Sequence, residues 1–347
     1  MRSACLAVTE NKEAHTAENY RSNVDEVLED FKIKEKVVKT VTDNENKMRA
    51  AFDDDERSGC LAHIIHNSVT EGIKKTPEIK AVIEKNRKIA TKYHKSYAFK
   101  YQVEEEQKKR GLPVRAILQD VPTRWGSTRA STGSFLDKVE KDEEMSTRES
   151  DVFREQHQNM DAINSALRKI KYRGDQKLTQ YLLTEEDMAR IKTVNQFLTK
   201  LDVFSTTLGG DKYVTSSVLM PVIACMKKML QEDSSDPLYI ARMKEVILED
   251  FNRRVAKNID TDFFLLATAL DPRWKDLKMI RRSERDLVFT RLQREMSILT
   301  KPNLPAEEVV SNKPKKRRLL DFDESDDEES NEEDPMEAEL KSFKTNL

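Results

Sequence analysis

Asp43 is the first residue whose type and position could do chemistry. It follows the β-branched run at residues 36–41, so we expect it at the carboxyl end of a strand. An α/β fold binds ligands at that edge, and a carboxylate oxygen there suits Mg²⁺, which two-metal enzymes use to activate water. A capping role is the alternative, because Asp43 precedes helix-compatible sequence and could accept amide hydrogen bonds. The local sequence alone favours capping, and one aspartate cannot hold two metals.

Cys60 and His63 form a second group, with His66 three residues further on. This spacing supplies half of a zinc site, but the other cysteines and histidines are scattered singly along the chain. The sequence therefore favours a helix start with a small buried thiol over a zinc site. Nucleophilic catalysis by Cys60 is disfavoured, because His63 lies one turn away on the same helix, a poor position for deprotonating the sulfur.

Arg124 and Trp125 close the segment Pro122-Thr-Arg-Trp125. An arginine and a tryptophan at a strand end could contact a phosphate and stack on an unpaired base. The alternative is a tryptophan that anchors a strand–helix junction, and the sequence leaves both open. Further along, a short basic run has the composition of a nuclear localisation signal and predicts a nuclear protein. Its residues are Lys315, Lys316, Arg317 and Arg318.

An α/β core is predicted to position these residues. We expect strands near residues 2–8, 36–41 and 115–121, with a helix at residues 15–31 between the first two. Strand, helix, strand is the order of a parallel α/β unit, so residues 1–127 are assigned to the core. Within this range, the sequence predicts a charged loop at residues 53–59 and a long charged helical stretch at about residues 78–109. Residues 128–300 show helical periodicity nearly throughout and predict an all-helical domain. Residues 301–347, basic and then acidic, cannot bury a core, and we expect them to be disordered.

The composition narrows the class of protein. The chain has 347 residues, of which 36% are charged and 37% hydrophobic. Its formal net charge of -2 combines a more basic body with an acidic run near the C-terminus. Three cysteines far apart argue against a disulfide framework. No apolar run approaches the ~18–20 residues of a membrane span, and no secretion signal is evident, so we expect no membrane partner.

The order of the motifs resembles the hAT superfamily of transposases and, more closely, the vertebrate BED zinc-finger proteins domesticated from them. The resemblance covers roughly residues 1–280 and rests on separate blocks. They are Val41-Thr-Asp-Asn-Glu-Asn-Lys-Met48, Cys60-Leu-Ala-His63, Asp120-Val-Pro-Thr-Arg-Trp-Gly-Ser-Thr128, His15-Thr-Ala-Glu-Asn19, Leu208-Gly-Gly-Asp-Lys-Tyr-Val-Thr215 and Ala267-Thr-Ala-Leu-Asp-Pro-Arg-Trp274.

This resemblance implies a ribonuclease H-like core interrupted by a large helical insertion domain. Active members of the family use three acidic residues to bind two Mg²⁺ and cut DNA, and Asp43 corresponds to the second of them. Cys60 and His63 match a motif close to the active site. Arg124 and Trp125 match a motif whose tryptophan lies near the DNA end.

Departures from the family pattern shape the functional expectation. The family's first acid lies on a strand that would precede residue 1, the segment of the third is replaced by the tail, and the BED finger is absent. We therefore expect a partial core, a catalytically inactive nuclear protein that associates with DNA or regulates transcription, and no cofactor unless a completed site binds Mg²⁺. A protein partner or second copy would cover the truncated core, and no small-molecule substrate is expected. The alternatives are an active Mg²⁺-dependent nuclease completed by another chain, and a protein scaffold that does not bind DNA.

Overall fold

The computed structural model describes residues 5–8, 14–52, 56–121, 125–136, 158–170, 178–210, 215–231 and 233–300. These residues are mostly helical and contain one two-stranded parallel sheet. The chain divides into two compact units that alternate along the sequence. Unit 1 takes its described residues from Met1–Leu61, Thr207–Met229 and Lys257–Leu347, and unit 2 from Ala62–Thr206 and Leu230–Ala256. Within the described ranges, no helix has the length and apolar character needed to cross a bilayer.

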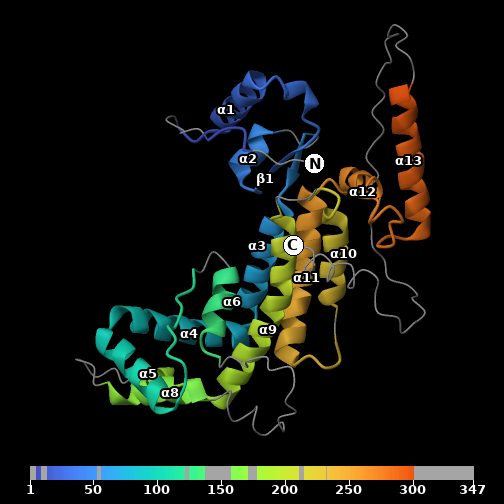
Figure 1. The fold of residues 1–347 in the computed structure, drawn as a ribbon. Coiled ribbons are helices and arrows are strands. Elements are labelled where there is room, and N and C mark those ends of the chain that lie inside the picture. The colour runs from blue at the N-terminus through green and yellow to red at the C-terminus, as the bar shows by residue number, and fades with distance from the viewer. Residues whose placement is uncertain are drawn as a thin grey trace. The chain divides into compact units, whose positions relative to one another are not determined.

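Unit 1 contains the small sheet. Strand β1 (Thr40–Thr42) pairs in parallel with β2 (Arg57–Gly59), and helix α2 (Asn46–Ala51) lies between them in the chain. Helix α1 (Ala17–Asp30) begins at Thr16, whose Oγ1 accepts a hydrogen bond from the amide of Asn19 at 3.2 Å, and it packs against α2 (Figure 1). The remaining elements of unit 1 are the 3-10 helix η1 (Lys34–Lys36), α10 (Leu219–Met229), α12 (Thr261–Ala269) and α13 (Arg282–Thr300).

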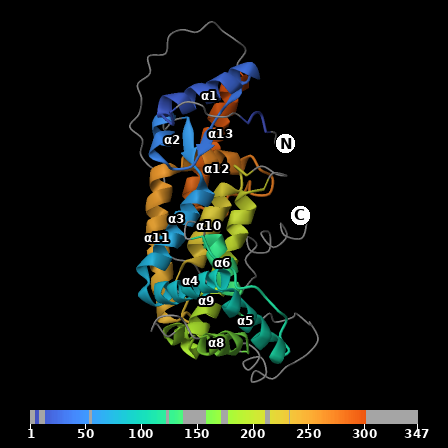
Figure 2. The same cartoon turned by 90° about the vertical axis from the view of Figure 1, so that its left-hand side faces the viewer.

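Unit 2 is helical. Helices α3 (Leu61–Lys75), α9 (Glu185–Leu208) and α11 (Leu238–Asn258) run alongside one another in both views (Figures 1 and 2). Gly72 of α3 lies so close to Ile247 of α11 that an added Cβ would come within 2.3 Å of it. The other elements are α4 (Pro77–Lys95), α5 (Tyr97–Lys109), α6 (Trp125–Gly133), α8 (Gln158–Lys169) and η2 (Leu178–Tyr181).

The helix predicted at residues 15–31 is confirmed, and the described parts of residues 128–300 are mostly helical, as expected. A continuous helical stretch was expected over residues 78–109, where the structure has two helices. Ser96 ends α4 and begins α5, and its Oγ accepts a hydrogen bond from the Phe99 amide at 3.3 Å. A serine side chain that captures a free amide at a helix start stabilises the break.

The strand predictions are mostly wrong. Residues 36–41 form a strand only from Thr40, since Lys36 belongs to η1 and residues 37–39 have no regular structure. Residues 5–8 of the predicted first strand have no strand structure, and Val8 there is 92% exposed instead of buried. The α/β part of the described chain is thus smaller than predicted. Its second strand, β2, lies in a segment that the sequence predicted to be a charged loop.

Residues 115–121 are not a strand either, because their main chain bonds to side chains rather than to a neighbouring strand. Gln107 of α5 accepts from the amide of Arg115 at 3.1 Å and donates to its carbonyl at 3.3 Å. The amide of Leu118 donates to Oγ of Ser134 at 3.0 Å. Main-chain groups need hydrogen-bond partners, and here side chains of α5 and of the turn that follows α6 supply them.

Candidate nucleic-acid interface

Asp43 lies directly after β1, as the sequence predicted. Its side chain is exposed, and Oδ1 accepts a hydrogen bond from the amide of Glu45 at 3.2 Å. Glu45 is the N-cap residue of α2. The carboxylate therefore stabilises the turn into α2, which is a local role close to the capping alternative.

Arg57 of β2 contributes a positive charge to the same strand end. The residue is 4% exposed, and its guanidinium donates to Thr42 Oγ1 at 2.7 Å, to the Asp43 carbonyl at 2.6 Å and to Asn44 Oδ1 at 3.0 Å. A guanidinium offers donors in a fixed planar fork, which suits such a divided set of acceptors. Sequence reasoning missed Arg57, because it lies in a polar run with no periodicity to mark it as buried.

Gly59 ends β2 at a point where separate segments of the chain approach one another closely. A Cβ at this position would lie 2.2 Å from Asn44 Oδ1 and 2.9 Å from Cβ of Asn258. The next residue, Cys60, donates its amide to the Thr42 carbonyl at 2.7 Å and extends the pairing of the two strands. Cys60 is half-buried with a free thiol, in agreement with the alternative of a packed helix start.

Helix α3 and the tryptophan motif meet in unit 2. His63 is exposed on α3, and its ring lies 6.1 Å from that of His66, centroid to centroid. Nδ1 of His66 lies 3.5 Å from the amide nitrogen of Trp125, the first residue of α6. Among the residues that the structure describes, no three His, Cys, Asp or Glu side chains are grouped so that they could hold a metal ion.

Trp125 is 5% exposed, so its ring packs inside unit 2 as the anchoring alternative requires. Stacking on a base would need that ring to leave its buried position. Arg124 and the basic residues Lys315, Lys316, Arg317 and Arg318 lie outside the described residues.

The residues on either side of this motif are tied together. Oδ2 of Asp120 accepts hydrogen bonds from Arg87 Nε of α4 at 2.7 Å and from Thr128 Oγ1 of α6 at 3.2 Å. Oγ of Ser127 accepts from the Val121 amide at 2.8 Å and donates to the Val121 carbonyl at 2.9 Å. We call the hydrogen bonds of Asp120 to Arg87 and Thr128 the Asp120 bracket. The side chain of Asp120 is 1% exposed, so these bonds lie inside unit 2. They fix the start of α6 against α4.

Helix α4 carries the basic face of this region. Lys80, Lys88 and Lys95 are exposed, while the apolar residues of the helix are buried. Lys88 lies over the ring of Tyr181 at 5.6 Å from its centroid. Two other basic residues of the helix are paired, Lys85 with Asp187 at 2.5 Å and Arg87 with Asp120 at 2.7 Å, so the exposed lysines carry the basic face. An exposed basic face of this kind attracts phosphate.

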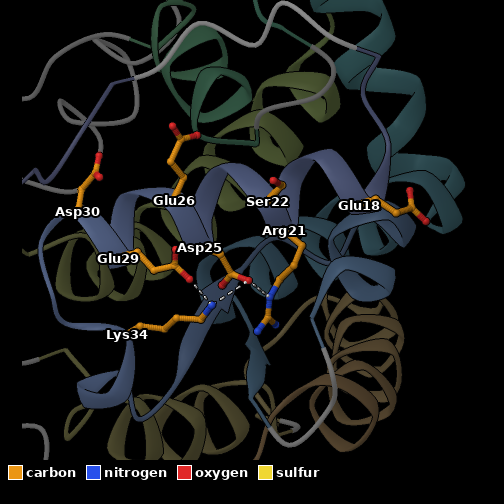
Figure 3. Close-up of a pocket in the computed structure, with 8 residues that line it drawn as sticks. All are labelled: Glu18, Arg21, Ser22, Asp25, Glu26, Glu29, Asp30 and Lys34. Carbon is orange, nitrogen blue, oxygen red and sulfur yellow. Dashed lines mark hydrogen bonds and ion pairs between the residues drawn. The ribbon is translucent and has the colours of Figure 1, made fainter.

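An open pocket on α1 has the opposite character (Figure 3). Two of its lining residues, Arg21 and Lys34, are basic, and both are paired: Arg21 with Asp25 at 3.1 Å, and Lys34 with Glu29 at 2.8 Å. The surplus of carboxylates there repels a nucleic-acid backbone. The residues that line the pocket are Glu18, Arg21, Ser22, Asp25, Glu26, Glu29, Asp30 and Lys34.

Comparison with known proteins gives a distant relative. No family model matches the chain. Human Zinc finger BED domain-containing protein 4 is 24% identical over 280 residues, which cover 79% of this chain and 21% of that protein. The matched region thus spans about a fifth of the relative's length. Over most of its length, the chain is distantly similar to a BED zinc-finger protein.

Proposed function

We propose that the chain is a DNA-associated nuclear protein of hAT transposase descent that takes part in transcription regulation and does not cut DNA. The observation that carries the proposal is the basic face of α4, held against the start of α6 by the bond from Arg87 to Asp120. The distant similarity to a BED zinc-finger protein supports the same interpretation. Residues 1–127 would be the remnant of a ribonuclease H-like core, and residues 128–300 the helical insertion domain.

Binding would begin with the exposed lysines of α4. Lys80, Lys88 and Lys95 follow one another along one side of the helix and would neutralise backbone phosphates, which releases counterions from the DNA. Contacts of this kind position a protein without reading the base sequence. Arg124, in the motif beside the Asp120 bracket, would add a contact at the start of α6, while the buried Trp125 would anchor that helix.

Arg57 supports the non-catalytic part of the proposal. A two-metal nuclease needs a concentration of negative charge that holds divalent cations. At the end of β1, a buried guanidinium instead lies 2.6 Å from the Asp43 carbonyl, and the Asp43 carboxylate accepts a main-chain amide. The fixed positive charge of Arg57 would repel a cation bound to Asp43.

Helix α13 favours a second candidate function, the binding of a protein partner or another copy of the chain. Leu287, Met296 and Ile298 are 55%, 60% and 56% exposed on this helix. Exposed apolar side chains grouped on one element are typical of interaction surfaces. A protein scaffold would use α13 and would not require DNA.

The test is binding of the full chain to duplex and hairpin-ended DNA over a salt series, with Mg²⁺ present and cleavage scored in the same samples. We expect salt-sensitive binding without cleavage. The triple variant Lys80→Glu, Lys88→Glu, Lys95→Glu should lower the affinity and reduce the salt slope by roughly 1 for each phosphate that a lysine no longer neutralises. The exposed Lys275→Glu of unit 1 is the matched control and should change neither.

Each other outcome has a definite meaning. Cleavage of either DNA would overturn the non-catalytic proposal and restore the nuclease alternative. An equal loss of affinity in the triple variant and in Lys275→Glu would remove α4 as the contact surface. Absence of binding at low salt would leave the protein scaffold.

A further inference from the structure

Two tyrosines of α5 lie stacked on the exposed surface of unit 2. Tyr97 and Tyr101 are 83% and 48% exposed, and their rings are 6.5 Å apart, centroid to centroid, with 22° between the ring planes. They are four positions apart on a helix and so share one face. Tyrosines are rigid amphipathic side chains that are enriched at binding surfaces.

The break between α4 and α5 explains why this pair points outward. Ser96 ends one helix and begins the next, which resets the positions that face the core. Tyr93 and Phe99, on either side of the break, take buried positions at 2% and 0% exposure. The same short segment thus gives two aromatic rings to the core and leaves Tyr97 and Tyr101 at the surface.

The surroundings of the pair are basic. Residues 92–101 contain three lysines and no acidic residue. Lys95 and Lys100 are exposed beside the tyrosines in the sequence, and Lys100 lies 3.9 Å from Glu104. The next two acids are also paired, Glu105 with Lys108 at 3.0 Å and the buried Glu106 with Lys109 at 3.6 Å. Each of these carboxylates therefore has a lysine partner, and Lys95 adds positive charge.

We propose that Tyr97 and Tyr101 form a stacking platform for unpaired nucleobases of a single strand, with Lys95 and Lys100 contacting its phosphates. The inference rests on the proposed function and names the form of nucleic acid that this part of the protein binds. Every base has a π face, so aromatic stacking binds single strands with little dependence on sequence. Bases inside a duplex are already stacked on one another and cannot use the platform.

The charge around the rings selects this occupant. Lysines that flank exposed aromatic rings complement a phosphate backbone that carries bases. The platform also belongs to the segment that continues the basic helix α4, whose lysines are proposed to contact DNA. A nucleic acid bound by both α4 and the tyrosine platform would be a junction between paired and unpaired DNA.

The experiment measures binding of fluorescent oligothymidine, oligouridine and a duplex of equal length to the full chain. The variants are Tyr97→Ala with Tyr101→Ala, and Tyr97→Phe with Tyr101→Phe. Phe31→Ala is the matched control, since Phe31 is an exposed aromatic residue of unit 1 at 51% exposure. Circular dichroism and thermal melting verify that each variant is folded. Photocrosslinking with a halogenated uracil in the oligonucleotide identifies the tyrosines in contact.

We expect the alanine pair to bind the single strands roughly tenfold more weakly, which lies within the loss that removal of stacking residues causes. Duplex affinity should be unchanged, the phenylalanine pair should bind nearly as the native chain does, and crosslinks should map to Tyr97 or Tyr101. Comparison of oligothymidine with oligouridine tells whether the natural strand is DNA or RNA, and stacking on either supports the platform.

Unchanged single-strand binding in the alanine pair would overturn the inference and assign the tyrosines to a protein contact. So would an equal loss of single-strand and duplex affinity, because that would mean a general charge or folding effect. If the native chain binds only the duplex, the platform is refuted while the proposed function stands. If it binds neither, the proposed function fails as well.

Discussion

Nη2 of Arg57 lies 2.6 Å from the main-chain oxygen of Asp43, so a buried cation of β2 holds the residue that the family resemblance assigns to a metal. The same guanidinium bonds to Thr42 and Asn44. Three consecutive residues at the end of β1 thus depend on one side chain from the neighbouring strand. This relationship makes Arg57 a structural centre of unit 1.

Replacing Arg57 with alanine should destabilise the protein by about 2–4 kcal/mol, because buried polar groups at the end of β1 lose their donor. Arg57→Lys keeps the charge without the planar fork and should recover only part of the loss. Urea unfolding followed by circular dichroism measures both. A stability of Arg57→Ala equal to that of the native chain would show that the guanidinium bonds contribute nothing.

Asp43→Asn should leave folding and DNA binding unchanged. The asparagine oxygen can accept the Glu45 amide as the carboxylate does, and asparagine is well suited to such turns. The comparison is made on affinity and melting temperature, with Asp43→Ala as the variant that removes the acceptor. Loss of a nuclear activity in folded Asp43→Asn would mean that the carboxylate charge is functional and would contradict the non-catalytic proposal.

Gly59→Ala and Gly126→Ala form a matched pair. At Gly59 a Cβ would meet Asn44 Oδ1 at 2.2 Å, while at Gly126 nothing lies within 4 Å of the added atom. We expect Gly59→Ala to destabilise by about 1–3 kcal/mol through overpacking. Gly126→Ala, in helix α6, should be neutral or stabilise by up to about 1 kcal/mol. Thermal melting of the two variants decides, and equal melting temperatures would argue against the close approach of Asn44 to β2.

Acid should weaken unit 2 through Glu106. Hydrogen bonds from Lys169 and then Arg110 lower the pKa of Glu106 from 4.5 to about 2. A carboxyl whose folded pKa is lowered stabilises the fold above its unfolded pKa and loses that contribution as the pH falls toward the folded value. Glu106→Gln should therefore flatten the decline in stability between pH 4.5 and about 2. Glu18→Gln, an exposed residue of unit 1, is the control, and identical profiles for native and Glu106→Gln chains would refute the coupling.

Deleting residues 315–318 should move a fluorescent fusion of the chain from the nucleus to the cytoplasm. The run is basic, and short basic runs of this kind act as nuclear localisation signals. Microscopy of the deletion beside a variant with the exposed Lys74-Lys75 pair changed to alanine separates a specific signal from general charge. Nuclear accumulation of the deleted chain would mean that the address lies elsewhere.

The sequence predicted the helices well, because their apolar residues recur at helical spacing along residues 191–201 and elsewhere. Strand β2 escaped prediction, since Arg57, Ser58 and Gly59 are polar or lack a side chain although all are buried. What stabilises β2 is the bonding of Arg57 to β1, a contact between residues distant in sequence. The spacing of apolar residues gives no information about such a contact.

The candidate site likewise has features that the sequence predicted and features that it did not. The local role of Asp43 and the buried position of Trp125 both match alternatives that the sequence left open. The hydrogen bond from Arg87 to Asp120, 33 residues further along the chain, could not be predicted from the sequence. Tyr97 is exposed because the helix breaks at Ser96. A prediction of one continuous helix over residues 78–109 does not include that break. These features arise from tertiary packing.

The segment at residues 115–121 has a consequence for how this part of unit 2 opens. A strand exchanges its amide protons together when its neighbour leaves, because one ladder protects all of them. Here the amides of Arg115, Leu118 and Val121 are protected by Gln107, Ser134 and Ser127, from different places in the chain. Each amide should therefore exchange with deuterium at its own rate, set by the rotamer freedom of one side chain. The segment would loosen residue by residue, and the motif at Trp125 could shift while the helices around it stay folded.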